Sequence, residues 1–273
     1  MSARRRLDDE LVRRKLARSR TQAQADIAEG RVLVGGAPAA KPARLVHPGD
    51  AIVVTGEPPR FVSRAGAKLD AALDRFGIEV AGRRCLDAGA STGGFCDCLL
   101  QRGAAQVVAV DVGRGQLHER IAADPRVHVL DRTNVRDLDL ASIGEPVDVV
   151  TADLSFISLR LVVDALLAAV RADGDLVLLV KPQFEAGREV VSKGRGIVTD
   201  PEVWREVLLE VTSAIGARGA TIMGAMASPV TGSDGNVEFV LHVRPSRAAA
   251  RSADDLVAEA VGEAVRVHPG KGR

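Results

Sequence analysis

The fold class of this chain is decided by the stretch CLDAGASTGGF, residues 85–95. It opens on apolar residues, continues through an aspartate and three glycines, and ends where a helical pattern begins. Glycines let the backbone turn sharply and approach a ligand closely, and a helix that starts after them presents free backbone N–H groups. The stretch therefore predicts a buried strand, a ligand-binding turn over 87–95, and a following helix.

Short apolar runs alternate with helical patterns around this turn. The runs that we interpret as strands are Cys85–Leu86, Val107–Val110, Val127–Leu130, Val147–Thr151, Leu176–Val180, Thr221–Met226 and Val237–Val243. Helices fit between them at Lys68–Phe76, Ser158–Val170 and Pro201–Ala217. Such alternation is typical of an α/β, Rossmann-like fold with a mostly parallel seven-stranded sheet. Because only a loop separates the last two runs, we expect one antiparallel strand.

The first 59 residues follow a different pattern and predict a small α+β domain. Its first helix is predicted from apolar residues at helical spacing, which are Leu7, Leu11, Val12 and Leu16. A second helix is predicted after the capping box formed by Ser19 and Gln22. The boundaries that we predict are 1–59 for this domain, 60–63 for a linker, 64–246 for the α/β domain and 247–273 for a C-terminal helix with a flexible tail.

Positive charge is concentrated at the N-terminus. Residues 1–59 hold eleven Lys or Arg against seven Asp or Glu, although the net charge of the whole chain is +1. This imbalance favours an anionic partner such as RNA, with a solvated helix face as the alternative. The basic residues that we expect to contact RNA are Arg4, Arg6, Arg18, Arg20 and Lys41. Aromatic residues are only 3% of the chain, so base stacking is not expected to dominate binding.

Several classes of protein are disfavoured. No apolar run is long enough to span a bilayer, and no apolar segment of a secretory signal follows the basic N-terminus. The three cysteines have neither disulfide nor metal-ligand spacing. We therefore expect a cytoplasmic protein with reduced thiols and no metal site.

The glycine-rich turn matches neither the dinucleotide nor the P-loop pattern. An acid before the glycines suits a cationic, phosphate-free cofactor, and S-adenosylmethionine is such a molecule. An acid after the second strand can accept ribose hydroxyls, and polar residues after the third can face adenine. The predicted cofactor-binding residues are Asp87, Gly89, Ala90, Ser91, Gly93, Gly94, Phe95, Asp111, Asp131 and Asn134. The structural alternatives are a tight turn for the glycines and helix caps for the polar residues.

Residues at the other strand ends indicate the methyl acceptor. The sequence after the fourth strand is Asp153-Leu154-Ser155-Phe156, which lacks the prolines typical of base-amino methyltransferases. No cysteine nucleophile follows the fourth or fifth strand. Instead, we predict a catalytic set consisting of Lys68, Asp153, Lys181 and Glu238. A lysine with a lowered pKa can remove the proton of a ribose hydroxyl. Phe156 is a candidate to stack on the target base, with core packing as the alternative.

These motifs resemble a known family. The four residues are similar to the K-D-K-E tetrad of FtsJ-type ribose 2′-O-methyltransferases, and SRTQA, GRVLVGG and HPGD resemble the RNA-binding motif of the ribosomal protein S-four type. Together with FVSRAGAKL, they identify the chain as resembling the TlyA family. The resemblance implies S-adenosylmethionine as the donor, cytidine 2′-hydroxyls in 16S or 23S ribosomal RNA as the acceptor, ribosomal subunits as partners, and an effect on sensitivity to capreomycin. One departure is Pro59-Arg60-Phe61-Val62, where the family often has R-x-W-V.

Two other functions remain open at this point. The family is also described as haemolysins, which would require a membrane-lytic protein. A non-catalytic RNA-binding protein associated with the ribosome is the second alternative. The target nucleotide and the oligomeric state stay undetermined by the sequence.

Overall fold

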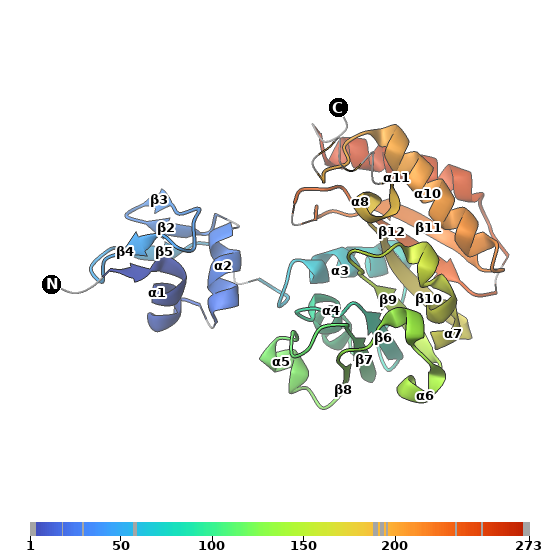
Figure 1. Cartoon of the computed structure of the whole chain (residues 1–273), viewed down its shortest axis with the longest axis horizontal. Coiled ribbons are helices and arrows are strands. Elements are labelled where there is room, and N and C mark those ends of the chain that lie inside the picture. Colours follow the sequence, from blue (N-terminus) through green and yellow to red (C-terminus); the bar gives the residue numbers. More distant parts are fainter. Residues whose placement is uncertain are drawn as a thin grey trace. The chain divides into compact units, whose positions relative to one another are not determined.

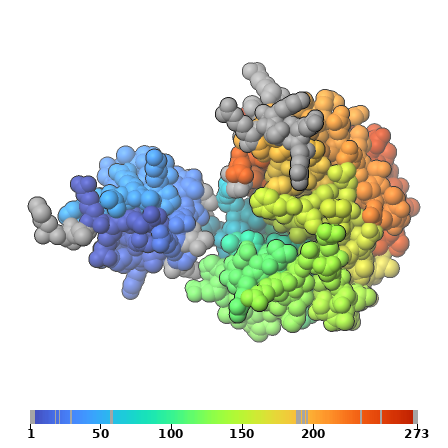
Figure 2. All heavy atoms as spheres, in the orientation of Figure 1, coloured from blue at the N-terminus to red at the C-terminus, as the bar shows by residue number. Residues whose placement is uncertain are grey.

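The computed structural model divides the chain into two compact units, Met1–Arg60 and Phe61–Arg273 (Figure 1). The residues that the structure describes are 4–17, 19–28, 30–56, 59–187, 191, 194, 196–232, 234–246 and 248–269. In the space-filling view, the larger unit runs from cyan at its first helix to red at its last (Figure 2). No helix among these residues is both long and apolar enough to cross a membrane.

The first unit packs two helices against short strands. Its elements are β1 Arg5–Arg6, α1 Leu7–Arg13, α2 Arg20–Ala28, β2 Val32–Val34, β3 Ala37–Pro38, β4 Leu45–Val46 and β5 Ile52–Val54. Strand β1 pairs with β4, and β2 lies between β3 and β5. The predicted cap at the start of α2 is confirmed, because Gln22 N donates to Ser19 Oγ at 3.2 Å. The prediction of Leu16 on the buried stripe is wrong, because α1 ends at Arg13 and Leu16 is 37% exposed.

The second unit is built on one seven-stranded sheet with the order β11-β12-β10-β9-β6-β7-β8. Its strands are β6 Arg84–Ala88, β7 Gln106–Val110, β8 Val127–Leu130, β9 Val147–Ala152, β10 Val170–Val180, β11 Thr221–Ala227 and β12 Phe239–Arg244. Only β12 runs antiparallel to its neighbours β10 and β11, while the other pairs are parallel. The predicted α/β fold with a mostly parallel sheet is therefore confirmed.

Helices cover both faces of this sheet. They are α3 Ala65–Phe76, α4 Gly94–Gln101, α5 Glu119–Ala122, η1 Val135–Asp137, α6 Leu140–Ile143, η2 Leu159–Leu161, α7 Val163–Ala169, α8 Pro182–Glu185, α10 Pro201–Gly216 and α11 Ala253–Val267. The single helix predicted over Ser158–Val170 is divided into η2 and α7. The fifth strand begins at Val170, earlier than the predicted Leu176, and Val170 pairs with Val147 in the sheet. Ser252 caps the start of the last helix, because its Oγ accepts a hydrogen bond from Asp255 N at 3.1 Å.

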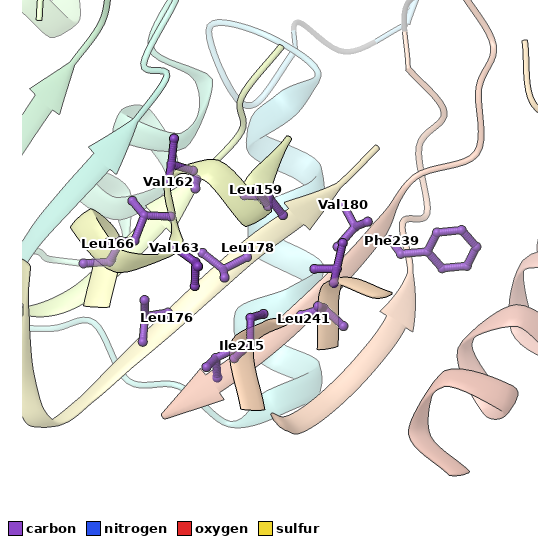
Figure 3. Close-up of a cluster of buried hydrophobic side chains, with 14 of the residues drawn as sticks. Leu159, Val162, Val163, Leu166, Leu176, Leu178, Val180, Ile215, Phe239 and Leu241 are labelled. Carbon is purple, nitrogen blue, oxygen red and sulfur yellow. The ribbon is translucent and has the colours of Figure 1, made fainter. Parts of the chain in front are cut away.

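The core forms two layers because side chains alternate along each strand. In β10, Leu176 and Leu178 join one cluster with α7, α10 and α11, whereas Val177 joins a second cluster with α3 and α4. Figure 3 shows the first cluster, in which β10 side chains face those of α7. Phe61, which falls within the predicted linker, is 6% exposed and belongs to the second cluster.

The direction of the strands determines where the polar residues gather. Strands β6, β7, β9 and β10 are mutually parallel, so their carboxyl ends meet at one edge of the sheet. Asp153 follows β9 and Lys181 follows β10 at this edge. Because β12 is antiparallel, its first residues reach the same edge, and Val180 is in register with Phe239. Glu238 is thereby brought beside Lys181.

Candidate active site

A cavity of about 580 Å³ opens at this edge of the sheet. Its volume lies within the range of small-molecule sites. The residues that line it are Ser63, Arg64, Ala65, Lys68, Gly89, Ala90, Ser91, Thr92, Gly94, Phe95, Asp153, Ser155, Phe156, Lys181, Gln183, Phe184, Val191, Gly196, Thr231, Gly232, Asp234 and Glu238. All four predicted catalytic residues are among them, so the structure brings them together.

Lys181 and Asp153 form one of the two pairs of the predicted catalytic set. Lys181 Nζ lies 2.6 Å from Asp153 Oδ1 and donates to Ser155 Oγ at 2.9 Å. The ring of Phe184 lies 5.8 Å from the same nitrogen, within reach of a cation–π interaction. Lys181 is 9% exposed, because it directly follows the buried strand β10 and Pro182 begins α8 directly after it.

Lys68 and Glu238 form the other half. Lys68 Nζ donates to Glu238 Oε2 at 2.5 Å, and both side chains are buried. Burial raises the pKa of Glu238, and the charges of Lys68 and Lys181 oppose that rise. Two cations and two anions in one small volume balance each other, which limits the cost of burying them.

The glycine-rich turn wraps one wall of the cavity. Gly89 has a φ of 83°, and a Cβ placed there would lie 2.6 Å from the carbonyl oxygen of Asp153. Only glycine fits this close approach of two strand ends. Gly93, which precedes α4, has a φ of 91°, and it is absent from the cavity lining while Gly94 and Phe95 are present. The turn therefore forms part of the cavity wall, and its contact with a cofactor stays a prediction.

Asp87 lies beneath this turn and does not line the cavity. It is fully buried and accepts hydrogen bonds from Cys96 Sγ at 3.0 Å and Thr151 Oγ1 at 3.1 Å. Burial raises its pKa to about 7, against the lowering effect of these two bonds. The geometry thus corrects the expectation of direct contact with a cofactor: Asp87 ties the turn to β9 and α4.

The three polar residues after β7 and β8 differ in their surroundings. Asp111 accepts from Ser91 N at 2.8 Å and from Gly113 N at 2.7 Å, which ties it to the glycine-rich turn. Asp131 accepts from Gly115 N at 2.9 Å, and Asn134 caps η1 by accepting from Arg136 N at 3.1 Å. None of the three is among the described residues that line the cavity. The capping alternative applies to Asn134.

Phe156 projects from the rim of the cavity. It is 90% exposed, and its ring centroid lies 5.0 Å from that of Phe184. The alternative of core packing is therefore wrong. Phe156 also has a φ of 63°, a left-handed conformation that is unfavourable for a bulky residue and is common at functional sites.

Sequence reasoning missed several residues of the cavity wall. They include Arg64, Ser155, Gln183, Thr231 and Asp234. Gln183 Oε1 is buried and accepts no hydrogen bond from the described residues, so it is available to a ligand. For Ser155 and Gln183 the only signal in the sequence was their position just after predicted strands, and that position does not tell which side chains turn inward.

The predicted RNA-binding residues of the first unit have mixed surroundings. Arg6 and Arg20 both approach Asp8, at 2.9 and 3.0 Å. The Arg6 guanidinium holds the pKa of the buried Asp8 carboxyl well below its usual range. Arg4 and Lys41 are exposed, and Arg18 lies outside the described residues. Arg6 and Arg20 therefore support the fold of the unit, although 39% and 52% of their side chains stay exposed.

Comparison with known proteins agrees with this geometry. Residues 61–244 match the family model of the FtsJ-like methyltransferases, and residues 5–52 match the S4 domain. The 16S/23S rRNA (cytidine-2′-O)-methyltransferase TlyA of Mycobacterium tuberculosis is 51% identical over 267 residues, which cover 96% of this chain and 99% of that protein. Hemolysin A of Brachyspira hyodysenteriae is 37% identical over 238 residues, which cover 87% of this chain and 98% of that protein. A solved structure from Streptococcus thermophilus that carries a hemolysin name has a TM-score of 0.74 at 36% identity, covering 97% of this chain and 98% of that one.

Proposed function

Because this chain belongs to the FtsJ-like methyltransferase family and carries an S4 domain, we propose that it methylates the ribose 2′-hydroxyl of cytidine in ribosomal RNA. The methyl donor that we propose is S-adenosylmethionine. The observation that carries the proposal is the convergence of Lys68, Asp153, Lys181 and Glu238 on one cavity. The relative from Mycobacterium tuberculosis, whose name states this reaction, supports the choice of substrate.

The residues at the cavity wall fit such a donor. The backbone from Gly89 to Phe95 can hold its amino-acid part. Asp111 lies outside the cavity lining but is fixed against Ser91 N, and from there it can accept the ribose hydroxyls. The turn contains no lysine of the kind that holds a phosphate. When bound, the cofactor supplies an electrophilic methyl group on a sulfonium, which leaves as a neutral thioether.

The chain's own residues then act on the hydroxyl. Lys181 accepts the proton of the 2′-hydroxyl as the new oxygen–carbon bond forms, and Asp153 at 2.6 Å balances the resulting ammonium. Lys68 and Glu238 hold the opposite wall as an ion pair that carries no net charge. Phe156 stacks on the target base or its neighbour after the nucleotide has left its helix.

The first unit supplies RNA affinity without chemistry. Its basic residues favour phosphate contacts, and the S4 match covers nearly the whole unit. We propose ribosomal subunits in the cytoplasm as the partner, and the level of methylation as the reason for a change in capreomycin sensitivity.

The direct test is transfer of labelled methyl from S-adenosylmethionine to each purified ribosomal subunit, followed by mapping of 2′-O-methyl marks. We expect label on a cytidine ribose with the wild-type protein and a rate of labelling lower by roughly 10²- to 10⁴-fold with Lys181→Met. Label on a base, or no label on either subunit, would refute the proposal. Lysis of lipid vesicles by wild type and by Lys181→Met alike would instead favour the haemolysin reading.

A further inference from the structure

Ser155 contacts the proposed general base although it lies outside the tetrad. It follows β9 two residues after Asp153, lines the cavity, and accepts a hydrogen bond from Lys181 Nζ at 2.9 Å. Lys181 thus has two oxygen neighbours on one loop, the carboxylate at 2.6 Å and the hydroxyl at 2.9 Å.

The two neighbours act differently. Among the described residues, Asp153 Oδ1 accepts no well-aligned hydrogen bond, so its interaction with Lys181 is mainly a charge attraction. Such an attraction depends on distance and does not set the rotation of the amine about its Cε–Nζ bond. The hydrogen bond to Ser155 is directional and does set it. The charge attraction to Asp153 acts on the ammonium form of Lys181. In the neutral form, which has lost one proton to solvent, an N–H that points at Ser155 confines the lone pair to the remaining tetrahedral directions.

We propose that Ser155 is a positioning residue that aims the Lys181 amine at the 2′-hydroxyl. This inference rests on the proposed function, in which Lys181 accepts the hydroxyl proton. Ser155 makes and breaks no bond in the reaction; it acts through Lys181.

Hydrogen bonds between α8 and the loop after β9 keep Ser155 and Lys181 in fixed positions relative to each other. Glu185, the last residue of α8, accepts from Ser158 Oγ at 2.5 Å and from Leu159 N at 2.6 Å. The helix that starts after Lys181 is therefore tied to the loop that carries Ser155. Reacting groups held in this way gain much of their rate from orientation.

The primary test uses two substitutions at this position in the full-length protein. Ser155→Ala should lower the single-turnover rate of methyl transfer on the order of 10- to 100-fold, while the affinities for S-adenosylmethionine and RNA and the melting temperature stay within error. Ser155→Thr keeps the hydroxyl and should recover most of the rate. Ser246→Ala is the matched control, because its exposed hydroxyl donates to Ala172 O and is not part of the cavity lining. An unchanged rate in Ser155→Ala, or an equal loss in Ser155→Thr, would overturn the inference.

A double-mutant cycle tests whether Ser155 affects the rate only through Lys181. In a Lys181→Met background, measured with excess enzyme over long incubations, Ser155→Ala should have no further effect on the residual rate. A further loss equal to that in the wild-type background would mean that Ser155 acts independently of Lys181, which would overturn the inference. The wild-type reaction separates the two hypotheses: if wild type methylates a cytidine ribose, the proposed function stands whatever Ser155 does.

Discussion

Lys68 Nζ lies 2.5 Å from Glu238 Oε2 across 170 positions of the sequence. One residue belongs to α3 and the other immediately precedes β12, so only the closed sheet brings them together. Both side chains are buried, and removal of either partner would leave an unpaired buried charge. The pair therefore links the two walls of the cavity as well as contributing to its charge balance.

Lys181→Arg should abolish most activity while binding remains. Arginine keeps the positive charge but cannot accept a proton, so we expect a loss of roughly 10²- to 10⁴-fold in the rate of methyl transfer. Calorimetric affinities for S-adenosylmethionine and RNA should change little. The same substitution at Lys15, in the first unit, is the matched control. Near-normal turnover in Lys181→Arg would show that a positive charge at this position is sufficient for methyl transfer and that Lys181 is not the proton acceptor.

Asp111→Ala should weaken cofactor binding. The carboxylate fixes Ser91 N and Gly113 N, and charged hydrogen bonds of this kind contribute about 1.5–3 kcal/mol. We expect the dissociation constant to rise on the order of 10- to 100-fold. Asn134→Ala should have a smaller effect, since it removes only the cap of η1. An equal loss of cofactor affinity in the two variants would instead support the predicted contact of Asn134 with adenine.

Gly93→Arg should destabilise the fold as well as weaken cofactor binding. The sequence alone suggests that this variant loses the cofactor and keeps its fold. In the structure, Gly93 has a φ of 91°, and an added Cβ would lie 2.9 Å from Leu117 Cδ2. We therefore expect a lower melting temperature together with lost binding, measured by thermal unfolding with and without S-adenosylmethionine. A wild-type melting temperature would contradict this expectation.

Asp87 should make stability depend on pH. Its folded-state pKa of about 7 exceeds the unfolded value of 3.8, so the folded state holds the proton more tightly. The free energy of unfolding should fall as the pH rises from about 4 to about 7, by up to roughly 4 kcal/mol. Asp87→Asn should flatten this slope in urea titrations. Asp124→Asn is the contrasting control: its bonds with Arg126 lower the pKa of Asp124, so its loss should leave the slope between pH 5 and 8 unchanged.

Phe156→Ala should reduce activity without loss of stability. The side chain is 90% exposed, so its removal leaves no cavity, and a lost stacking contact costs about 1–3 kcal/mol per base. Turnover on structured ribosomal RNA should fall more than turnover on a short single strand. Phe239→Ala is the control for packing, because that ring is fully buried and its loss costs about 3–5 kcal/mol. A large drop in melting temperature for Phe156→Ala would contradict the exposed position.

Substitutions at Arg4 and Arg20 should distinguish a role in RNA binding from a role in the stability of the first unit. Arg4 is exposed, so Arg4→Gln should lower the salt slope of RNA binding by up to about 0.9 without destabilising the first unit. Arg20→Gln also removes a partner of the buried Asp8, so it should lower the melting temperature as well. An unchanged salt slope in both variants would exclude these residues as phosphate contacts.

The sequence by itself determined the order of strands and helices and the residues at the strand ends. Strand β8 has the predicted bounds, Val127–Leu130, because hydrophobic periodicity is a local property of the chain. The same local rule identified Asp153 and Lys181 as residues directly after buried strands. It failed at the start of β10, predicted at Leu176, because pairing with Val147 begins the strand at Val170.

Only the tertiary structure decided which of these side chains face the cavity. Asp87 and Ser155 both follow the pattern of polar residues at strand ends, yet Asp87 turns into the core and Ser155 lines the cavity. Glu238 reaches Lys68 because β12 runs antiparallel between β10 and β11, a pairing set by contacts far apart in sequence. Side-chain direction depends on packing across the closed sheet, and that packing exists only once the whole unit has folded.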